Sequence, residues 1–313
     1  MEEERTGARL RPIGPSSSQP QKPYTEMGSP PTGNTFAIVN QKGGVGKTTT
    51  AVNLSAALAS LGRIILLVDL DPQGNSTSGV GISKTGLRMS VYDVLIGGDP
   101  LDHVIQRTAT AGLDLVPSDV RLAGAEVELT ATIARENRLK AALRTARNHY
   151  DVVIIDCPPS LGLLTINALT AADACLIPVQ CEYYALEGLS SLVTTIDLVR
   201  RHLNTGLEVS GVLLTMADPR TKLSDQVATE VRNHFGSKVY ETVVPRSVRL
   251  AEAPSYGQPI IAYAPGSRGA AAYLTLAGEF ADRIGLPHGS NRGAAVQVPA
   301  SASGVDPNGD GGD

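Results

Sequence analysis

A glycine-rich segment with two lysines, Gln41–Thr49, carries the residue types that bind phosphate groups. It follows the apolar run Phe36–Asn40 and leads into a helical pattern, which is the setting that a phosphate-binding loop requires. Glycines let several backbone N–H groups converge on phosphate oxygens, and the first turn of a helix adds positive partial charge. Lys47 is placed to reach the β and γ phosphates of a nucleotide, Thr48 to bind Mg²⁺, and Thr49 to bond the α phosphate. The predicted nucleotide contacts of this loop are Gly43, Gly44, Val45, Gly46, Lys47, Thr48 and Thr49.

The loop departs from the general GxxxxGK[ST] pattern at its start. Gln41 stands where the first glycine is expected, and an additional lysine, Lys42, follows it. A glycine-rich turn with incidental lysines is the alternative interpretation. We favour the phosphate loop because the strand, the glycines, the Lys-Thr pair and the helix occur in the required order.

Two apolar runs end in aspartates. Ile64–Asp69 leads to Asp71, and Val152–Asp156 leads into Cys-Pro-Pro. Ligands of open parallel sheets bind where the strands end, and an aspartate there commonly holds hydrated Mg²⁺. We therefore predict that Asp156 lies on the Mg²⁺ side and that Asp71 positions or activates the attacking water. An aspartate in such a place can also cap a helix or stabilise a turn, and for Asp69 neither interpretation is favoured. The predicted metal-binding residues are Thr48, Asp71 and Asp156.

Short apolar runs alternate with helical patterns through most of the chain. Several of these runs are almost wholly apolar, which indicates strands with both faces buried. The alternation predicts an α/β fold with a mainly parallel, twisted sheet flanked by helices. The expected strands are Phe36–Asn40, Ile64–Asp69, Leu113–Pro117, Val152–Asp156, Ala174–Val179, Val209–Thr215 and Thr242–Pro245.

The 313 residues are 42% hydrophobic and 19% charged, an ordinary globular composition. No apolar run approaches the roughly 20 residues of a membrane span, and the start MEEER does not resemble a secretory signal, so we expect a cytoplasmic protein. Residues 1–34 and 287–313 are rich in Pro, Ser and Gly, and are predicted to be disordered tails around one domain, 35–286. The cysteines form no CxxC pair, and buried packing is expected for Cys157, Cys175 and Cys181.

Six segments of the domain resemble the ParA/Soj chromosome-partitioning ATPases, members of the MinD/ParA superfamily with a deviant Walker A loop. The resemblance covers nearly all of residues 34–286 and leaves out the tails. The segments are KGGVGKTTT at 42–50, DLDPQGN at 69–75, DCPPSLGLLTINAL at 156–169, PVQCEYYALEGL at 178–189, GVLLTM at 211–216 and PRSVRLAEAPSYGQPI at 245–260.

The resemblance implies an ATPase with slow basal turnover, in which ATP and Mg²⁺ lie between the two subunits of a sandwich dimer. Lys42 resembles the signature lysine that crosses to the partner's phosphates. Lys42 is therefore assigned to nucleotide binding and, with Lys47 and Asp71, to catalysis. Gly43 would lie where the subunits approach most closely. Met216 and Pro245 fall where the family holds the adenine.

The resemblance also implies that the dimer binds double-stranded DNA without sequence preference and associates with the nucleoid. A ParB-type centromere-binding protein, through a basic segment, would accelerate hydrolysis. The net charge of −4 does not exclude this, because only a local group of cations is needed. Arg220 and Arg249 match DNA-contacting arginines of the family, and Arg246 is a third candidate. Alternatively, these arginines are solvated or paired with acids such as Asp218, Glu241 or Glu252.

Two other functions are alternatives for a chain with these motifs. A positioning ATPase of the MinD type would bind lipid through an amphipathic C-terminal helix, whereas this chain ends in Gly, Ser and Asp. We therefore expect no membrane partner. A metabolic ligase or kinase of the same superfamily would use ATP on a small molecule, and turnover that responds to DNA and a partner protein would argue against it.

Overall fold

The computed structural model describes residues 34–182, 189–218 and 220–286. The two expected tails lie outside these residues, apart from Asn34, where the first strand begins. Within the described residues, eight strands form one sheet in the order β3-β4-β2-β5-β1-β6-β7-β8. Their bounds are β1 (Asn34–Ile38), β2 (Ile65–Asp69), β3 (Gln106–Arg107), β4 (Leu113–Val116), β5 (Val152–Asp156), β6 (Ala174–Gln180), β7 (Glu208–Ala217) and β8 (Val239–Pro245).

The predicted α/β fold with a mainly parallel sheet is confirmed. Each of the seven runs expected to be a strand forms one, with ends shifted by a few residues at most. The strand β3 was not predicted, because two residues give no periodicity to read. It pairs antiparallel with β4, whereas the other neighbouring strands are parallel.

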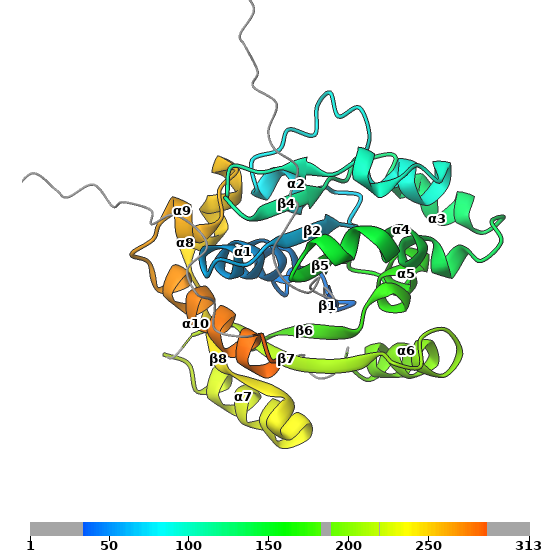
Figure 1. Cartoon of the computed structure of the whole chain (residues 1–313). Coiled ribbons are helices and arrows are strands. Elements are labelled where there is room, and N and C mark those ends of the chain that lie inside the picture. Colours follow the sequence, from blue (N-terminus) through cyan, green and yellow to red (C-terminus); the bar gives the residue numbers. More distant parts are fainter. Residues whose placement is uncertain (1–33, 183–188, 219, 287–313) are drawn as a thin grey trace, which may run out of the picture. The chain divides into compact units, whose positions relative to one another are not determined.

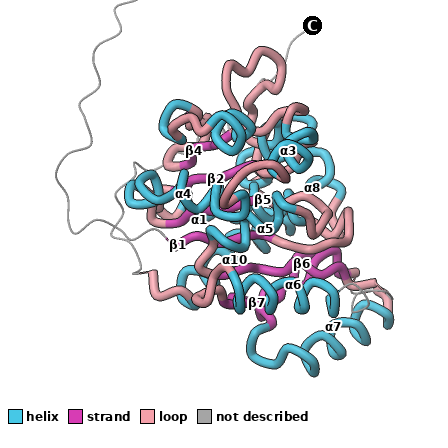
Figure 2. Tube along the Cα trace, turned by 90° about the vertical axis from the view of Figure 1, so that its right-hand side faces the viewer, coloured by secondary structure: helices cyan, strands magenta, loops and turns pink. Residues whose placement is uncertain are grey.

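Helices cover both faces of the sheet. Figure 1 shows α1 and α10 on one face and α4, α5 and α6 on the other, and Figure 2 shows the strands stacked in the same order from β4 to β7. The helices are α1 (Lys47–Ser60), α2 (Asn75–Gly79), α3 (Leu122–Leu129), α4 (Arg138–Ala146), α5 (Leu163–Ala171), α6 (Leu189–His202), α7 (Lys222–Phe235), α8 (Val248–Glu252), α9 (Ile260–Tyr263) and α10 (Arg268–Arg283).

The central strands β1, β2, β5 and β6 are almost wholly apolar because each one supplies two hydrophobic cores. In β5, Val152 and Ile154 belong to the core beneath α1 and α10, whereas Val153 and Ile155 belong to the core beneath α4 to α6. Successive side chains of a strand point to opposite faces, so a sheet covered on both sides needs continuous apolar runs.

The last described helix, α10, is held in the core by its apolar face. Tyr273 and Phe280 are fully buried, and the Phe280 ring packs edge-on against Phe36 with 4.7 Å between the ring centroids. The Tyr273 hydroxyl lies 3.3 Å from that of Thr50 on α1. Within the described residues no helix combines the length and the apolar character needed to cross a membrane.

Candidate nucleotide site

The phosphate loop lies between β1 and α1, at the edge of the sheet where the parallel strands end. Strand β5 pairs with both β1 and β2, so the fold brings Asp156 and the turn after Asp69 next to the loop. Gly44 and Gly46 have φ angles of 74° and 90°, a left-handed conformation that glycine adopts without strain. Gly46 leads directly into α1, whose first residue is Lys47.

Lys47 is a buried ammonium group without a matching ion pair among the described residues. Its Nζ donates a hydrogen bond to the carbonyl of Lys42 at 3.1 Å, which folds the side chain back over the loop. Burial lowers the pKa of Lys47, although Asp156, Cys157 and Asp71 partly offset that effect. A buried cation is stabilised when it gains an anionic partner, so phosphate oxygens would stabilise the Lys47 ammonium group.

Asp69 has the surroundings of a structural carboxylate. It is fully buried, and its Oδ2 accepts hydrogen bonds of 2.7 Å from both the backbone N–H and the hydroxyl of Thr77. Its Oδ1 accepts a third, from the N–H of Asp71 at 3.2 Å. Burial raises the pKa of Asp69, and these hydrogen bonds oppose the rise. The geometry therefore favours a role in shaping the turn that carries Asp71.

Asp156 is equally buried but less well satisfied. Its Oδ2 accepts a 2.8 Å hydrogen bond from Ser76, whereas its Oδ1 has no hydrogen-bond partner. Burial and then the charge of Asp69 raise the pKa of Asp156, while the Thr48 and Ser76 hydroxyls lower it. A buried carboxylate oxygen without a partner calls for an explanation, and a bound cation supplies one.

These surroundings fit Mg²⁺. Thr48 and Asp156 supply oxygen donors of the kind that the ion prefers, and the second Asp156 oxygen is available. Among the described residues no group of three or more His, Cys, Asp or Glu side chains could hold a metal ion. The ion would therefore also need phosphate oxygens and water, which is how Mg²⁺ commonly binds in nucleotide sites.

Asp71 is held by its own turn and by the segment before α3. Its side chain is buried and accepts a hydrogen bond from the N–H of Gln73 at 2.9 Å. Its carbonyl accepts one from the Ser118 hydroxyl at 2.8 Å. The lysine Lys84 secures the same turn from outside, because its Nζ donates to the carbonyl of Gln73 at 2.7 Å. Asp71 thus occupies a fixed place beside the phosphate loop.

The two residues expected to hold the adenine lie on neighbouring strands. Pro245 ends β8 and is paired with Ala217, which directly follows Met216 on β7. Met216 has a φ of 52°, which is uncommon for a residue other than glycine and often marks a functional site. A methyl group added at Gly46 would lie 3.9 Å from the end of the Met216 side chain, so this residue borders the phosphate loop.

Lys42 and Gly43 form the outer side of the loop. The backbone N–H of Lys42 donates to Asn40, but among the described residues no acid lies within ion-pair distance of its ammonium group. Gly43 is exposed, and a methyl group added there would meet only the Pro159 side chain, at 4.0 Å. The space in front of Gly43 is therefore open within a single chain.

Each of the three candidate DNA-binding arginines is exposed and paired with an acid. Arg220 pairs with Asp218 at 2.7 Å, and its hydrogen bonds lower the pKa of that acid. Arg249 pairs with Glu252 at 2.9 Å. The partner of Arg246 is Glu182, at 3.1 Å, which the sequence did not suggest. Exposed ion pairs are weak, so these arginines can exchange an acid for a phosphate.

Several supporting residues were missed by sequence reasoning. Ser76, Thr77 and Ser118 bond the aspartates, and the Thr215 hydroxyl donates to the carbonyl of Val45 at 2.8 Å. The Ser-Thr pair directly after Asn75 was the available signal, because hydroxyl residues at a helix start often bond nearby polar groups. Cys157, Cys175 and Cys181 are buried and unpaired, as expected.

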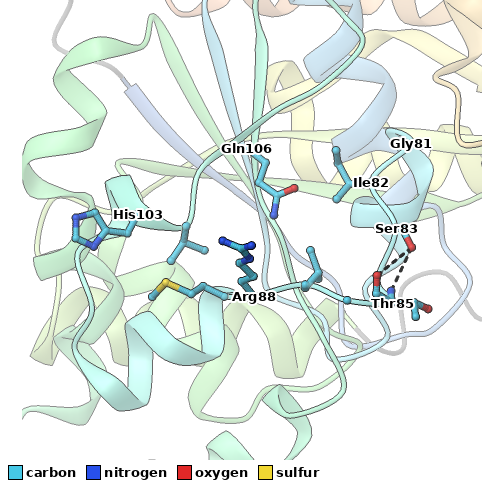
Figure 3. A pocket seen from close by; sticks show the side chains of 11 residues that line it. Gly81, Ile82, Ser83, Thr85, Arg88, His103 and Gln106 are labelled. Atoms are coloured by element: carbon cyan, nitrogen blue, oxygen red, sulfur yellow. Dashed lines mark hydrogen bonds between the residues drawn. The ribbon is translucent and has the colours of Figure 1, made fainter. Parts of the chain in front are cut away.

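A separate cavity of about 600 Å³ lies between the loop after α2 and the segment before β3. Figure 3 shows Arg88 and Gln106 extending toward one another in it, with His103 at one side and Ser83 at the other. None of its lining residues belongs to the phosphate loop or to the aspartate turns. The cavity is therefore distinct from the nucleotide site.

A phosphate loop followed by a helix, with aspartates at the ends of neighbouring parallel strands, defines a P-loop nucleoside triphosphatase. The family model described as an AAA domain matches residues 33–209. The sporulation initiation inhibitor protein Soj of Bacillus subtilis is 60% identical over 249 residues, covering 80% of this chain and 98% of that one. The chromosome partitioning protein ParA of Caulobacter vibrioides is 53% identical over 250 residues, covering 79% and 94%. The chain belongs to the ParA/Soj family of MinD/ParA-type ATPases and is itself an ATPase.

Solved structures agree with this class. Cobyrinic acid a,c-diamide synthase from Mycobacterium smegmatis, with a bound ATP analogue and magnesium, is 40% identical, covers 79% of this chain and 93% of that one, and has a TM-score of 0.70. The septum site-determining protein MinD from Pyrococcus horikoshii, complexed with Mg-ADP, is 24% identical, covers 82% and 99%, and has a TM-score of 0.69. At that identity the second likeness concerns the fold alone.

Proposed function

We propose that this ATPase binds ATP and Mg²⁺ between two copies of the chain, and that the resulting dimer holds double-stranded DNA during chromosome segregation. The observation that carries the proposal is the second lysine of the phosphate loop. Lys47 already serves the nucleotide of its own chain, so Lys42 is redundant unless it meets another nucleotide. Among the described residues no acid forms an ion pair with Lys42. The next residue, Gly43, borders open space.

Dimerisation makes the nucleotide part of the interface. Lys42 would neutralise phosphate charge on the partner's ATP, and this attraction disappears when the γ phosphate leaves. The oligomeric state then follows the nucleotide state, which makes the enzyme a switch. A ParB-type protein that accelerates hydrolysis would reset the switch.

For hydrolysis, we assign Thr48 and Asp156 to the Mg²⁺ side and Asp71 to the attacking water. Bound Mg²⁺ would neutralise charge that develops on the β and γ phosphates. Lys47 would hold those phosphates, and Asp71 would orient the water from its fixed turn. The slow basal rate expected for the family fits a site that the second subunit must complete.

DNA binding rests on Arg220, Arg246 and Arg249. Sequence-independent affinity grows with the number of phosphates neutralised, so doubling the set in a dimer strengthens binding sharply. The paired acids keep the arginines in the monomer weakly attractive, since each pair must open before a phosphate is bound. On this proposal the DNA-bound form is associated with the nucleoid.

The alternatives have less support. A MinD-type membrane role needs a free amphipathic helix, but the apolar face of α10, the last described helix, is buried against α1. Liposome sedimentation with ATP tests that role. A metabolic role is named for one solved relative at 40% identity, whereas the 60% identity to Soj favours partitioning.

The decisive experiment is size-exclusion chromatography with light scattering on an Asp71→Ala variant. With ATP and Mg²⁺ it should run as a dimer and shift nonspecific duplex DNA, and with ADP it should run as a monomer. Lys47→Ala is the control that cannot dimerise. A hydrolysis-blocked variant that binds ATP but stays a monomer, with and without DNA, contradicts the proposal.

A further inference from the structure

The backbone of Asp71 is held on both sides by hydrogen bonds that form a closed ring. Its N–H donates to Oδ1 of Asp69 at 3.2 Å, and its carbonyl accepts from the Ser118 hydroxyl at 2.8 Å. Between these two bonds, the Thr77 hydroxyl donates to Oδ2 of Asp69 at 2.7 Å and accepts from the N–H of Ser118 at 3.0 Å. We call Asp69, Asp71, Thr77 and Ser118 the aspartate ring.

The members of the aspartate ring come from three segments that the fold brings together. Asp69 ends β2, and Asp71 lies in the turn that follows. Thr77 lies on α2, and Ser118 follows β4, the strand that pairs with β2. All four residues are buried, so water competes little for these bonds. A buried polar network whose groups are satisfied holds its members rigidly.

The segment that carries Ser118 is anchored on its own side of the ring. The carbonyl of the preceding residue, Pro117, accepts a hydrogen bond from the N–H of Val91 at 2.8 Å. The following residue, Asp119, pairs with Arg121 at 2.7 Å. Because Ser118 is fixed from both neighbours, its hydroxyl restrains the carbonyl to which it donates.

Local hydrogen bonds fix the shape of the Asp71 turn but not its place in the site. Oδ1 of Asp71 accepts from the N–H of Gln73 at 2.9 Å, and the Asp71 carbonyl accepts from the N–H of Gly74 at 2.9 Å. Both donors belong to the turn itself, whereas the Ser118 hydroxyl ties the turn to another segment. A displacement of about 1 Å can cost a catalysed reaction about 100-fold in rate, so the bonds that place the turn matter for hydrolysis.

We propose that Thr77 and Ser118 are positioning residues for ATP hydrolysis, whose hydroxyls hold Asp71 where it orients the attacking water. This inference rests on the role of Asp71 in the proposed function and adds two residues that act through Asp71. Neither hydroxyl belongs to the phosphate loop, so ATP affinity and ATP-driven dimerisation should not depend on them. Loss of either hydroxyl should therefore lower kcat and leave the KM for ATP unchanged.

Two substitutions at Thr77 separate the effect of its hydroxyl from that of its methyl group. Thr77→Val keeps the volume of the side chain and loses the hydroxyl, whereas Thr77→Ser keeps the hydroxyl and loses the methyl group. Phosphate release at saturating ATP and Mg²⁺ should fall at least about tenfold in Thr77→Val and stay within about twofold of the natural chain in Thr77→Ser. Both variants should bind a fluorescent ATP analogue as the natural chain does.

Ser118→Ala is an independent test of the same ring. The Asp71 carbonyl keeps its hydrogen bond from Gly74, so the variant should fold, while its phosphate release should fall at least about tenfold. Tyr240→Phe is the control for the loss of a buried hydroxyl. Tyr240 is fully buried near the start of β8, and its hydroxyl lies 3.3 Å from that of Ser210. This control should hydrolyse ATP at the natural rate.

Natural turnover in both Thr77→Val and Ser118→Ala would overturn the inference, and so would equal losses of turnover in Thr77→Val and Thr77→Ser. A weaker affinity for ATP at unchanged kcat would also contradict it. Asp71→Ala, measured alongside, distinguishes this failure from that of the proposed function. If Asp71→Ala hydrolyses ATP at the natural rate, the assignment of Asp71 to the water fails, and this inference falls with it. If Asp71→Ala is inactive while Thr77→Val and Ser118→Ala are fully active, this inference alone fails.

Discussion

Asp69 and Asp156 lie side by side in register at the ends of β2 and β5, yet their carboxylates are satisfied to different degrees. Asp69 accepts three hydrogen bonds, whereas one oxygen of Asp156 accepts none. Both are fully buried, so exposure does not explain the difference. We infer a division of roles in which Asp69 shapes the turn and Asp156 is the carboxylate available to a cation.

Asp156→Asn should stabilise the nucleotide-free protein and remove Mg²⁺-dependent hydrolysis. The pKa of Asp156 is raised in the folded state, so its ionised form destabilises the fold as pH rises above the ordinary aspartate range. Asparagine removes that charge and can still accept from Ser76. A gain of about 1 kcal/mol corresponds to a rise of about 2–4 °C in Tm for a domain of this size. Thermal melts of both proteins between pH 5 and 8 should diverge toward pH 8.

Asp69→Asn is the matched control and should destabilise the protein, because the loss of its hydrogen bonds outweighs the removal of a carboxylate whose pKa is also raised. An asparagine cannot accept all three hydrogen bonds, and its amide group would face donors of Thr77 or Asp71. Leaving a buried donor unsatisfied costs about 1–3 kcal/mol, so the variant should melt earlier. Equal melting temperatures for the two variants would contradict the division of roles between the aspartates.

Lys47→Ala should fail to bind ATP, whereas Lys42→Ala should fail to dimerise. We assign the buried Lys47 to the nucleotide phosphates, so its loss should weaken ATP binding at least about tenfold. Lys42→Ala should bind ATP nearly as the natural chain does but lose ATP-driven dimerisation and turnover. Titration with a fluorescent ATP analogue, combined with light scattering, separates binding from assembly. Equal ATP affinity in Lys47→Ala would refute the assignment of the loop.

Gly43→Val should leave the folding of the single chain unchanged and block dimerisation. Within the chain a side chain at this position meets only Pro159, so folding and ATP binding should be retained while dimerisation is lost. Gly46→Val is the contrasting variant. Its φ of 90° costs a branched side chain about 1–2 kcal/mol, so that variant should also bind nucleotide poorly. Normal dimerisation of Gly43→Val would move the interface elsewhere.

Arg249→Glu should weaken DNA binding without changing ATP-driven dimerisation. Each lost phosphate contact lowers the dependence of log K on log salt by about 0.9, so a dimer should lose nearly twice that. Glu252→Gln should act in the other direction, because it frees Arg249 from its acid. Arg144→Glu, an exposed arginine on α4, is the control. Fluorescence anisotropy with a nonspecific duplex at several salt concentrations measures DNA binding by the three variants. If Arg249→Glu shows the same slope of log K against log salt as the natural chain, the DNA-binding surface lies elsewhere.

Local sequence predicted the strands and the phosphate loop well because both depend on patterns of neighbouring residues. Strand β3 and the pairing of Arg246 with Glu182 depend on segments distant in sequence. The different states of Asp69 and Asp156 likewise depend on Thr77 and Ser76, which the tertiary structure supplies.

The hydrogen bond from the Ser118 hydroxyl to the Asp71 carbonyl fixes the segment before α3 against the aspartate that we assign to the attacking water. A movement of the segment before α3 would therefore shift the backbone of Asp71 as well. A substitution at Ser118 would then alter the position of that aspartate without touching the phosphate loop.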